Sequence, residues 1–431
     1  MDAAIKEQVR RARKRFFAIA VSYFMGLFND NFYKEAALII AVMQDNTAIQ
    51  AAAAAVFTVC YMLGAAPGGW MADRFAKGHV IVAAKAVELA AMIVGAIGMW
   101  QGNWWLALTM IGLMGAQSAI FSPAMNGSIP ELYPTEYVQT ANTVVRILST
   151  AAIFIGMALA GYVMDMREPS WLGMERGIFL VGLFVLIAAT IGFLIAFGAP
   201  RIKPQPGSPR FPWSGPAESV REMIKIGRDP LLTVCVCGNV FIWSMAAVMT
   251  LLMVNLGISQ FGISASMTAG MKIVFLVGIA IGGLISNIIA QGPKFFRVFI
   301  PAYGTMAALL VVVGLVPYAF ALPTTRIVVM TLIALTGIAG GIILVPLESF
   351  IQIRPAANEK GRVIAAANFA VFSVMTLGAG LLYALNQLFH PTSSLGILGC
   401  FTGLYTVWLA GRLRRALQAE AARVAGTTSE G

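Results

Sequence analysis

Long apolar stretches, separated by short breaks rich in Gly, Pro and charged residues, run along most of the chain. A membrane-spanning helix needs about 20 mostly apolar residues, whereas a membrane β-barrel needs shorter segments of alternating polarity, which this sequence lacks. The pattern therefore predicts an all-α membrane protein with twelve transmembrane helices. These lie near residues 16–43, 50–71, 79–100, 103–125, 137–165, 175–199, 230–256, 265–290, 295–319, 325–350, 359–388 and 393–417.

The longest polar break separates the sixth predicted span from the seventh. Residues 200–229 are rich in Pro, Gly and basic residues, and Pro216–Gly227 has the pattern of a short amphipathic helix on a membrane surface. The chain then divides into two six-helix lobes with a linker between them and a tail at each end. The predicted parts are 1–15 (basic tail), 16–199 (first lobe), 200–229 (linker), 230–417 (second lobe) and 418–431 (second tail).

Composition agrees with residence in a bilayer. Of the 431 residues, 59% are hydrophobic and 11% charged, and the mean hydropathy is +0.80. Soluble domains are nearer half apolar and a quarter charged, so a soluble enzyme, a disordered chain and a secreted disulfide-rich chain are excluded. The sequence has no nucleophile elbow, phosphate-binding loop or paired Cys/His spacing. We therefore expect no enzymatic activity, no cofactor and no bound metal.

The net charge is +11, and the Lys and Arg residues that produce it are distributed unevenly between the two predicted sides of the membrane. The tails, the linker and the connections after even-numbered spans hold 23 of the Lys and Arg residues, whereas the opposite side holds 3, namely Arg167, Arg176 and Arg326. Because cytoplasmic loops carry the excess of Lys and Arg, both termini and the linker are predicted to face the cytoplasm. The positive charge is therefore a topology signal, and we expect no nucleic-acid partner. The N-terminus lacks the cleavage site of a signal peptide.

The two halves of the sequence contain a candidate internal repeat. The segments GAAPGGWMAD (64–73) and GIAIGGLISN (278–287) end the second and eighth spans, and their glycines match at an offset of 214 residues. The alternative is chance matching between glycine-rich helices. A duplicated six-helix unit is typical of two-lobed transporters, and the four-residue glycine spacing allows a neighbouring helix to approach closely.

The first span carries a cluster of polar residues near its middle. Ionisable residues are costly in lipid, so a functional role is the default hypothesis for them. Asp30 and Lys34 are four residues apart, as are Asn31 and Glu35, so a structural alternative is that each pair satisfies itself on the helix surface. The functional interpretation places Asp30 in a central cavity, with Glu35 nearer the outer end of the span.

The loop after the second span reads GWMADRFAKGH over residues 69–79. Asp73 ends a helix and can face the positive end of another helix, while Arg74 and Lys77 can pair with carboxylates or lipid phosphates. The loop resembles the major facilitator superfamily signature G-x-x-x-D-[RK]-x-[GA]-[RK]-[RK], from Gly69 to Gly78. The resemblance implies two six-helix lobes and a charged latch that separates when the lobes rock. The alternative is a simple positive-inside loop.

The remaining candidates are assigned to the latch or to the cavity. We favour Lys85 and Glu88 on the third span, and Arg146 on the fifth, as partners of Asp73 rather than substrate contacts. Glu136 and Glu359 follow Pro123 and Pro346 at the same distance, so they belong to duplicated loops of the latch. The expected cavity residues are Asn29, Asp30, Asn31, Lys34, Glu35, Gln117, Ser122, Asn126, Asn239, Trp243 and Glu348. Helix–helix hydrogen bonding is the alternative for the uncharged ones, and Glu348 fits either cavity or latch.

Three blocks of sequence resemble the bacterial lysophospholipid transporter family. They are FNDN (28–31), ADRFAKG (72–78) and FSPAMNGSIPEL (121–132). The resemblance implies that the chain moves lysophospholipids across the bacterial inner membrane by alternating access, toward the leaflet where an acyltransferase acts, with Asp30 as a cavity or gating charge. The chain departs from the family at Met125, where Lys is usual, and in lacking a basic residue in the seventh span. We expect membrane lipids as further partners, and a monomer.

Two other functions fit these residues. A proton-coupled drug or small-metabolite carrier of the same superfamily would use Asp30, Glu35 or Glu348 as its proton site, and a protonophore would abolish its uptake. A non-transporting scaffold or receptor is the second alternative, and the charged cluster at mid-membrane argues against it.

Overall fold

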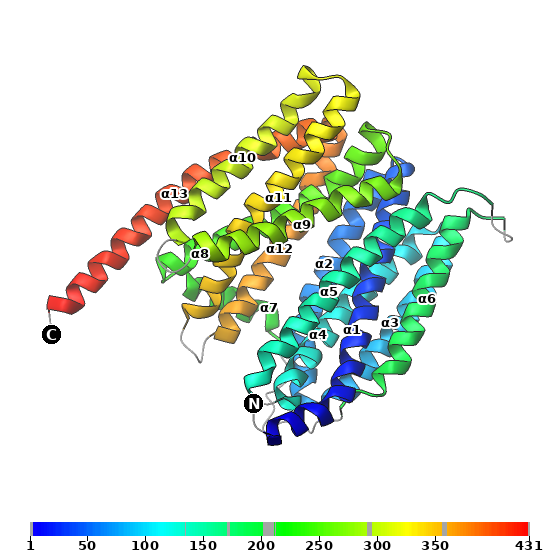
Figure 1. Ribbon diagram of the computed structural model, residues 1–431, viewed down its shortest axis with the longest axis horizontal. Helices are drawn as coiled ribbons and strands as arrows, with labels where there is room; N and C mark the ends of the chain where they lie inside the picture. Colours follow the sequence, from blue (N-terminus) through cyan, green and yellow to red (C-terminus); the bar gives the residue numbers. More distant parts are fainter. Residues whose placement is uncertain are drawn as a thin grey trace. The chain divides into compact units, whose positions relative to one another are not determined.

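Thirteen α-helices form the described part of the chain in the computed structural model (Figure 1). The structure describes residues 3–133, 135–169, 173–200, 211, 213–290, 295–355 and 360–429. The helices are α1 (Ala3–Met43), α2 (Thr47–Arg74), α3 (Lys77–Trp100), α4 (Trp104–Leu132), α5 (Thr135–Met164), α6 (Arg176–Ala196), α7 (Gly215–Ile226), α8 (Pro230–Asn255), α9 (Ala265–Ile289), α10 (Phe295–Ala319), α11 (Leu322–Ile353), α12 (Lys360–Leu388) and α13 (Pro391–Ser429). A π-helical turn, η1 (Leu256–Gln260), follows α8.

Each predicted span falls on one of these helices, and α7 occupies the predicted position of the short amphipathic helix. Among the described residues, eleven helices are long and apolar enough to cross a membrane. The first helix, α1, is not among the eleven, although its 41 residues exceed the required length. Its predicted membrane-spanning segment carries three charged residues within six positions, namely Asp30, Lys34 and Glu35, and this lowers its apolar character. The predicted class, an all-helical membrane protein, is confirmed.

Polar residues in the short breaks set where several helices begin. The side chain of Asn46 accepts a hydrogen bond from the backbone N–H of Ile49 at the start of α2. Asn103 accepts from the N–H groups of Trp105 and Leu106 at the start of α4. The first turn of a helix has N–H groups without backbone partners, so these side chains satisfy donors that would otherwise lie near hydrocarbon.

The chain forms two compact units. Unit 1 comprises Met1–Gly215 together with Ser264–Ala269, and unit 2 comprises Pro216–Ile263 and Gly270–Gly431. Within unit 1, the Asp165 carboxylate accepts hydrogen bonds from the backbone N–H of Ala265 (2.8 Å) and from the N–H and hydroxyl of Ser266 (3.1 and 2.6 Å). A carboxylate at a helix N-terminus satisfies its free N–H groups, which explains why this short segment belongs with unit 1.

The two units use the same pairs of helices for packing. In unit 1, α1 contacts α5 and α6, and α3 contacts α4 and α6. In unit 2, with α7 left aside, the corresponding pairs are α8 with α12 and α13, and α10 with α11 and α13. The repeated pairing supports a duplicated six-helix unit, which the glycine pattern predicts.

Glycines at matched positions bring helix backbones into contact in both units. A Cβ atom on Gly68 of α2 would overlap the backbone of Ala119 on α4, and one on Gly282 of α9 would overlap the backbone of Ile338 on α11. In lipid, helices associate through close packing rather than through the hydrophobic effect, so these contacts hold each unit together.

We predict that Gly282→Ala destabilises the protein, whereas Gly270→Ala on the same helix does not. Nothing lies within 4 Å of a Cβ placed on Gly270, so alanine there gains helix propensity of up to about 1 kcal/mol. Overpacking at Gly282 costs roughly 1–3 kcal/mol. Thermal unfolding of the purified protein in detergent measures both, and equal midpoints for the two variants would contradict the backbone contact.

Candidate functional site

A polar network lies in the middle of three helices of unit 1. Lys85 and Glu88 on α3 form an ion pair of 2.6 Å between Nζ and Oε2, and each side chain is 1% exposed. The carboxylate of Glu88 also accepts hydrogen bonds from Asn29 Nδ2 on α1 (3.3 Å) and from Gln117 Nε2 on α4 (3.0 Å). The charge of Glu88 is therefore balanced by one cation and supported by two neutral donors.

Asp30 joins this network through Ser118. The Ser118 hydroxyl lies 2.9 Å from Asp30 Oδ2, to which it donates, and 3.1 Å from Gln117 Oε1. Asp30 is 5% exposed, and its other oxygen, Oδ1, has no hydrogen-bond partner in the described part of the chain. We call Asn29, Asp30, Lys85, Glu88, Gln117 and Ser118 the mid-span network. It combines a neutralised ion pair with a carboxylate that keeps one free acceptor.

Small residues make room for the Lys85 ammonium. A Cβ on Gly26 of α1 would come within 2.6 Å of Lys85 Nζ, and one on Gly192 of α6 would lie 3.7 Å from it. The ring centroid of Phe121 lies 5.0 Å from the same nitrogen. Glycines and an aromatic face thus shape a site for this one cation inside the helix bundle.

Sequence analysis favoured Lys85 and Glu88 as partners of Asp73 in the latch, and the structure places them in the mid-span network instead. They belong to the mid-span network because both lie more than two turns inside α3, where a charge must be neutralised nearby. The side chains of Asp73, Glu136 and Arg146 lie outside the described part, as does Glu359, so their assignment to the latch stays a prediction.

Asn31, Lys34 and Glu35 are the other predicted cavity residues of α1. Asn31 donates to the carbonyl oxygen of Leu27 on its own helix (2.7 Å). The Lys34 ammonium lies 3.9 Å from the centroid of the Phe57 ring on α2, and Glu35 is 3% exposed. Of the predicted cavity residues on α1, therefore, Asn29 and Asp30 belong to the mid-span network.

At the start of α3, the predicted latch residue Lys77 pairs with Glu131 near the end of α4. A Cβ on Gly127 would lie 2.9 Å from Lys77 Cε, so glycine allows the lysine to reach across. The backbone of Gly78 packs against the carbonyl oxygen of Pro200, whereas a Cβ on Gly69 would meet open space. Arg74 is exposed. Sequence analysis missed Glu131, although it lies within the block 121–132.

In unit 2, two predicted cavity residues meet. Trp243 Nε1 on α8 donates to Glu348 Oε1 on α11 over 3.3 Å. Asn239, one turn before Trp243, is 4% exposed, and its Oδ1 has no hydrogen-bond partner among the described residues. In unit 1, Asn126 donates to Ser122 on α4 (3.3 Å) in an exposed position. These contacts fit helix–helix hydrogen bonding as well as a cavity lining.

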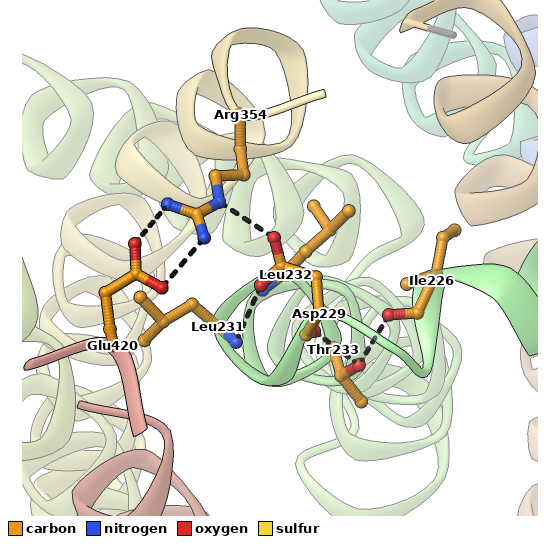
Figure 2. A network of polar contacts seen from close by, with 7 residues as sticks. All are labelled: Ile226, Asp229, Leu231, Leu232, Thr233, Arg354 and Glu420. Atoms are coloured by element: carbon orange, nitrogen blue, oxygen red, sulfur yellow. Dashed lines mark hydrogen bonds and ion pairs between the residues drawn. The ribbon is translucent and has the colours of Figure 1, made fainter. Parts of the chain in front are cut away.

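A second charge network joins the start of α8, the end of α11 and the last third of α13 in unit 2 (Figure 2). Arg354, just after α11, donates from Nε to Asp229 Oδ2 (2.8 Å) and from its two terminal nitrogens to both oxygens of Glu420 on α13 (2.8 and 3.0 Å). The other oxygen of Asp229 accepts from the N–H groups of Leu231 and Leu232, which caps α8. We call Arg354, Asp229 and Glu420 the end clasp. Sequence analysis counted Arg354 only as a topology signal.

The end clasp has the geometry of a strong ionic contact. Arginine's planar fork matches a carboxylate through two parallel hydrogen bonds. Hydrogen bonds to Glu420 and then to Asp229 raise the pKa of Arg354 above its usual value. The clasp therefore fixes the start of α8, the end of α11 and the turn of α13 that carries Glu420 relative to one another.

Two six-helix halves with the same packing pairs, and with charged residues at mid-span, define a secondary transporter. The family model described as "Major Facilitator Superfamily" matches residues 16–379. The chain belongs to this superfamily, whose members are transporters and not enzymes.

Known proteins resemble the chain in sequence or in fold. A lysophospholipid transporter of Serratia proteamaculans is 26% identical over 386 residues, which cover 85% of this chain and 87% of that protein. One of Salmonella enteritidis is 25% identical and covers 88% and 90%. Among solved structures, a POT family transporter with bound 5-aminolevulinic acid has a TM-score of 0.67 at 11% identity, covering 93% and 96%. A D-xylose–proton symporter has 0.63 at 18%, covering 92% and 97%. These structures share the fold.

We predict that Lys85→Met strongly destabilises the protein because it leaves the Glu88 carboxylate buried without its cation. Removing one partner of a buried ion pair costs roughly 3–5 kcal/mol. The double variant Lys85→Met with Glu88→Gln removes both charges and should recover most of the loss. Thermal midpoints in detergent and the amount of inserted protein measure this. A double variant no better than the single one would contradict the pairing.

For the end clasp, we predict that Arg354→Gln lowers the thermal midpoint by roughly 2–4 °C, the shift expected for about 1 kcal/mol in a domain of this size. Glu420→Gln should have a smaller effect because Asp229 still pairs with the arginine. Arg297→Gln on α10, an exposed position, is the matched control and should leave the midpoint unchanged. Equal shifts in all three variants would mean that overall charge, and not the clasp, sets the stability.

Proposed function

We propose that this protein moves lysophospholipids across the bacterial inner membrane by alternating access between its two six-helix lobes, with both termini in the cytoplasm. Support comes from the lysophospholipid transporters that are 25–26% identical over 85–88% of the chain. The orientation rests on the sorting of Lys and Arg between the two sides.

The observation that carries the proposal is the position of Asp30. This residue belongs to the FNDN block that resembles the lysophospholipid transporter family, and its buried carboxylate keeps Oδ1 without a hydrogen-bond partner in the described part. A buried acceptor of this kind is costly unless a ligand or proton uses it at some stage. The Lys85–Glu88 pair, which is already neutralised, positions Asn29 and Gln117 beside it.

A lysophospholipid has one acyl chain and a charged headgroup, so its carrier needs few polar groups and a large apolar surface. We therefore assign the headgroup to the mid-span network of unit 1, where Asp30 Oδ1 keeps a free acceptor in the described part of the chain.

The test is uptake of labelled lysophosphatidylethanolamine by spheroplasts that lack their own carrier. We expect uptake with the wild-type chain and a decrease of at least about tenfold with Asp30→Asn. That substitution keeps the size of the side chain and an acceptor for Ser118, but it removes the charge that makes such a hydrogen bond worth roughly 1.5–3 kcal/mol. Glu168→Gln removes a carboxylate that is 83% exposed, and it should transport normally.

Three results decide between the functions. Uptake at background with a correctly inserted wild-type chain would refute the lysophospholipid assignment. Normal uptake by Asp30→Asn would remove this residue from the site while leaving the substrate in place. Complete loss of wild-type uptake after addition of a protonophore would favour the proton-coupled carrier, since facilitated movement of a lysophospholipid does not need a proton gradient.

A further inference from the structure

One face of α13 changes from apolar to aromatic to basic along its length. Ile397, Phe401, Leu404 and Trp408 are exposed and follow one another at intervals of three or four residues. Arg412 and Arg415 continue the same interval and are exposed as well. Side chains with this spacing share one side of a helix. We call these six residues the outer stripe of α13.

The order of residue types along the outer stripe marks a membrane boundary. Leu404 is 73% exposed and Trp408 49% exposed, and large apolar side chains with that exposure contact acyl chains in a membrane protein. Tryptophan is enriched at the interface between hydrocarbon and water, and arginine lies among the headgroups beyond it. Trp408, Arg412 and Arg415 therefore reach the level of the phospholipid phosphates.

The two arginines are arranged to hold one anion. The Arg412 guanidinium carbon lies 5.9 Å from the ring centroid of Trp408, a cation–π contact that restrains the arginine over the indole. Arg415 is its neighbour at i+3. In the described part of the chain, neither arginine forms an ion pair with a carboxylate. Both guanidinium groups are available to a phosphate, which they recognise through paired hydrogen bonds.

A neighbouring face of α13, about 100° around the helix from the outer stripe, keeps the stripe in place. Leu409, Leu413 and Ala416 are buried in the core of unit 2, and Glu420 accepts two hydrogen bonds from Arg354 (Figure 2). The helix runs beside α10 and continues past its end (Figure 1). Because core packing and the end clasp together hold α13 in place, Arg412 and Arg415 stay exposed on the outer stripe.

We propose that Trp408, Arg412 and Arg415 form a binding site for the phosphate of an anionic diacyl phospholipid, whose acyl chain lies along Ile397, Phe401 and Leu404. Two cations that form no ion pair in the described part of the chain favour a headgroup with net negative charge over a zwitterionic one, which brings its own ammonium group. The site lies on the outer surface of one helix. It therefore holds a resident lipid of the surrounding leaflet, whatever substrate the protein carries.

The test is a titration of the full-length protein in detergent with phosphatidylglycerol, with bound lipid counted by native mass spectrometry. An arginine near a membrane surface contributes about fivefold to the affinity for anionic lipid. The double variant Arg412→Gln with Arg415→Gln should therefore bind roughly 30-fold more weakly than the wild type. Trp408→Leu keeps the apolar surface but loses the cation–π contact, and it should show an intermediate loss.

Arg414→Gln is the matched control. Arg414 is exposed at the same depth, but it lies about 100° around the helix from Arg415 and about 160° from Arg412. Because Arg414 lies off the outer stripe and outside the proposed site, the affinity of this variant for phosphatidylglycerol should stay within about twofold of the wild type, below the roughly fivefold contribution of an arginine that contacts the lipid. A loss equal to that of the double variant would overturn the site in favour of diffuse attraction between the helix and the membrane.

Two further measurements distinguish the ligand. Equal affinity for phosphatidylcholine would overturn the proposal, because an apolar surface alone would then explain binding. Full competition by inorganic phosphate would also overturn it, because the site would then be a simple anion site. Unchanged thermal midpoints of all variants without added lipid are expected for exposed side chains, and they show that a loss of binding is not a loss of fold.

Discussion

Hydrocarbon cannot solvate a charge, so every ionised side chain inside a span must be neutralised by the protein itself. The Lys85–Glu88 ion pair is where this constraint acts most directly, because both side chains are 1% exposed. The surrounding polar residues follow from it. Asn29 and Gln117 complete the hydrogen bonding of Glu88, and glycines on α1 and α6 leave space for the ammonium. A mid-span charge thus determines which residue types its neighbours can have.

The same medium explains how the helices pack. Lipid tails are as apolar as leucine, so burying leucine between two helices gains little, and close backbone contact has to hold the bundle together. The glycines of α2 and α9 provide that contact against α4 and α11. Rigid packing of this kind keeps Gln117 and Ser118 on α4 at fixed distances from Glu88 and Asp30, which a loosely packed helix could not do. The hydrogen bonds of the mid-span network therefore depend on the close packing of the helices that carry them.

The sequence predicted the helices and the family well because both depend on local composition. Twenty apolar residues in a row have few structural alternatives, and the loop from Gly69 to Gly78 is specific to the superfamily. The partners of individual charges were harder to predict because they depend on which helices become neighbours. Sequence analysis favoured Lys85 as a partner of Asp73, whereas in the structure its ion-pair partner is Glu88 on its own helix. Glu131 and Arg354 were missed for the same reason.

Glu131 and Arg354 are related by the internal repeat. Pro123 and Pro346 mark equivalent places at an offset of 223 residues, and Glu131 and Arg354 are also 223 residues apart. Each ends the corresponding helix of its unit, and each makes an ion pair there, Glu131 with Lys77 and Arg354 with Asp229 and Glu420.

The signs of the two charges are opposite, which follows from simple electrostatics. A helix C-terminus favours a cation, so Arg354 suits its position, whereas Glu131 depends on Lys77 to offset the unfavourable dipole. The partners of the two residues lie on different elements, since Lys77 begins α3, whereas Asp229 precedes α8 and Glu420 lies on α13. The repeat therefore places a charged residue at the end of this helix in both units, and the sign of each charge follows from its local partners.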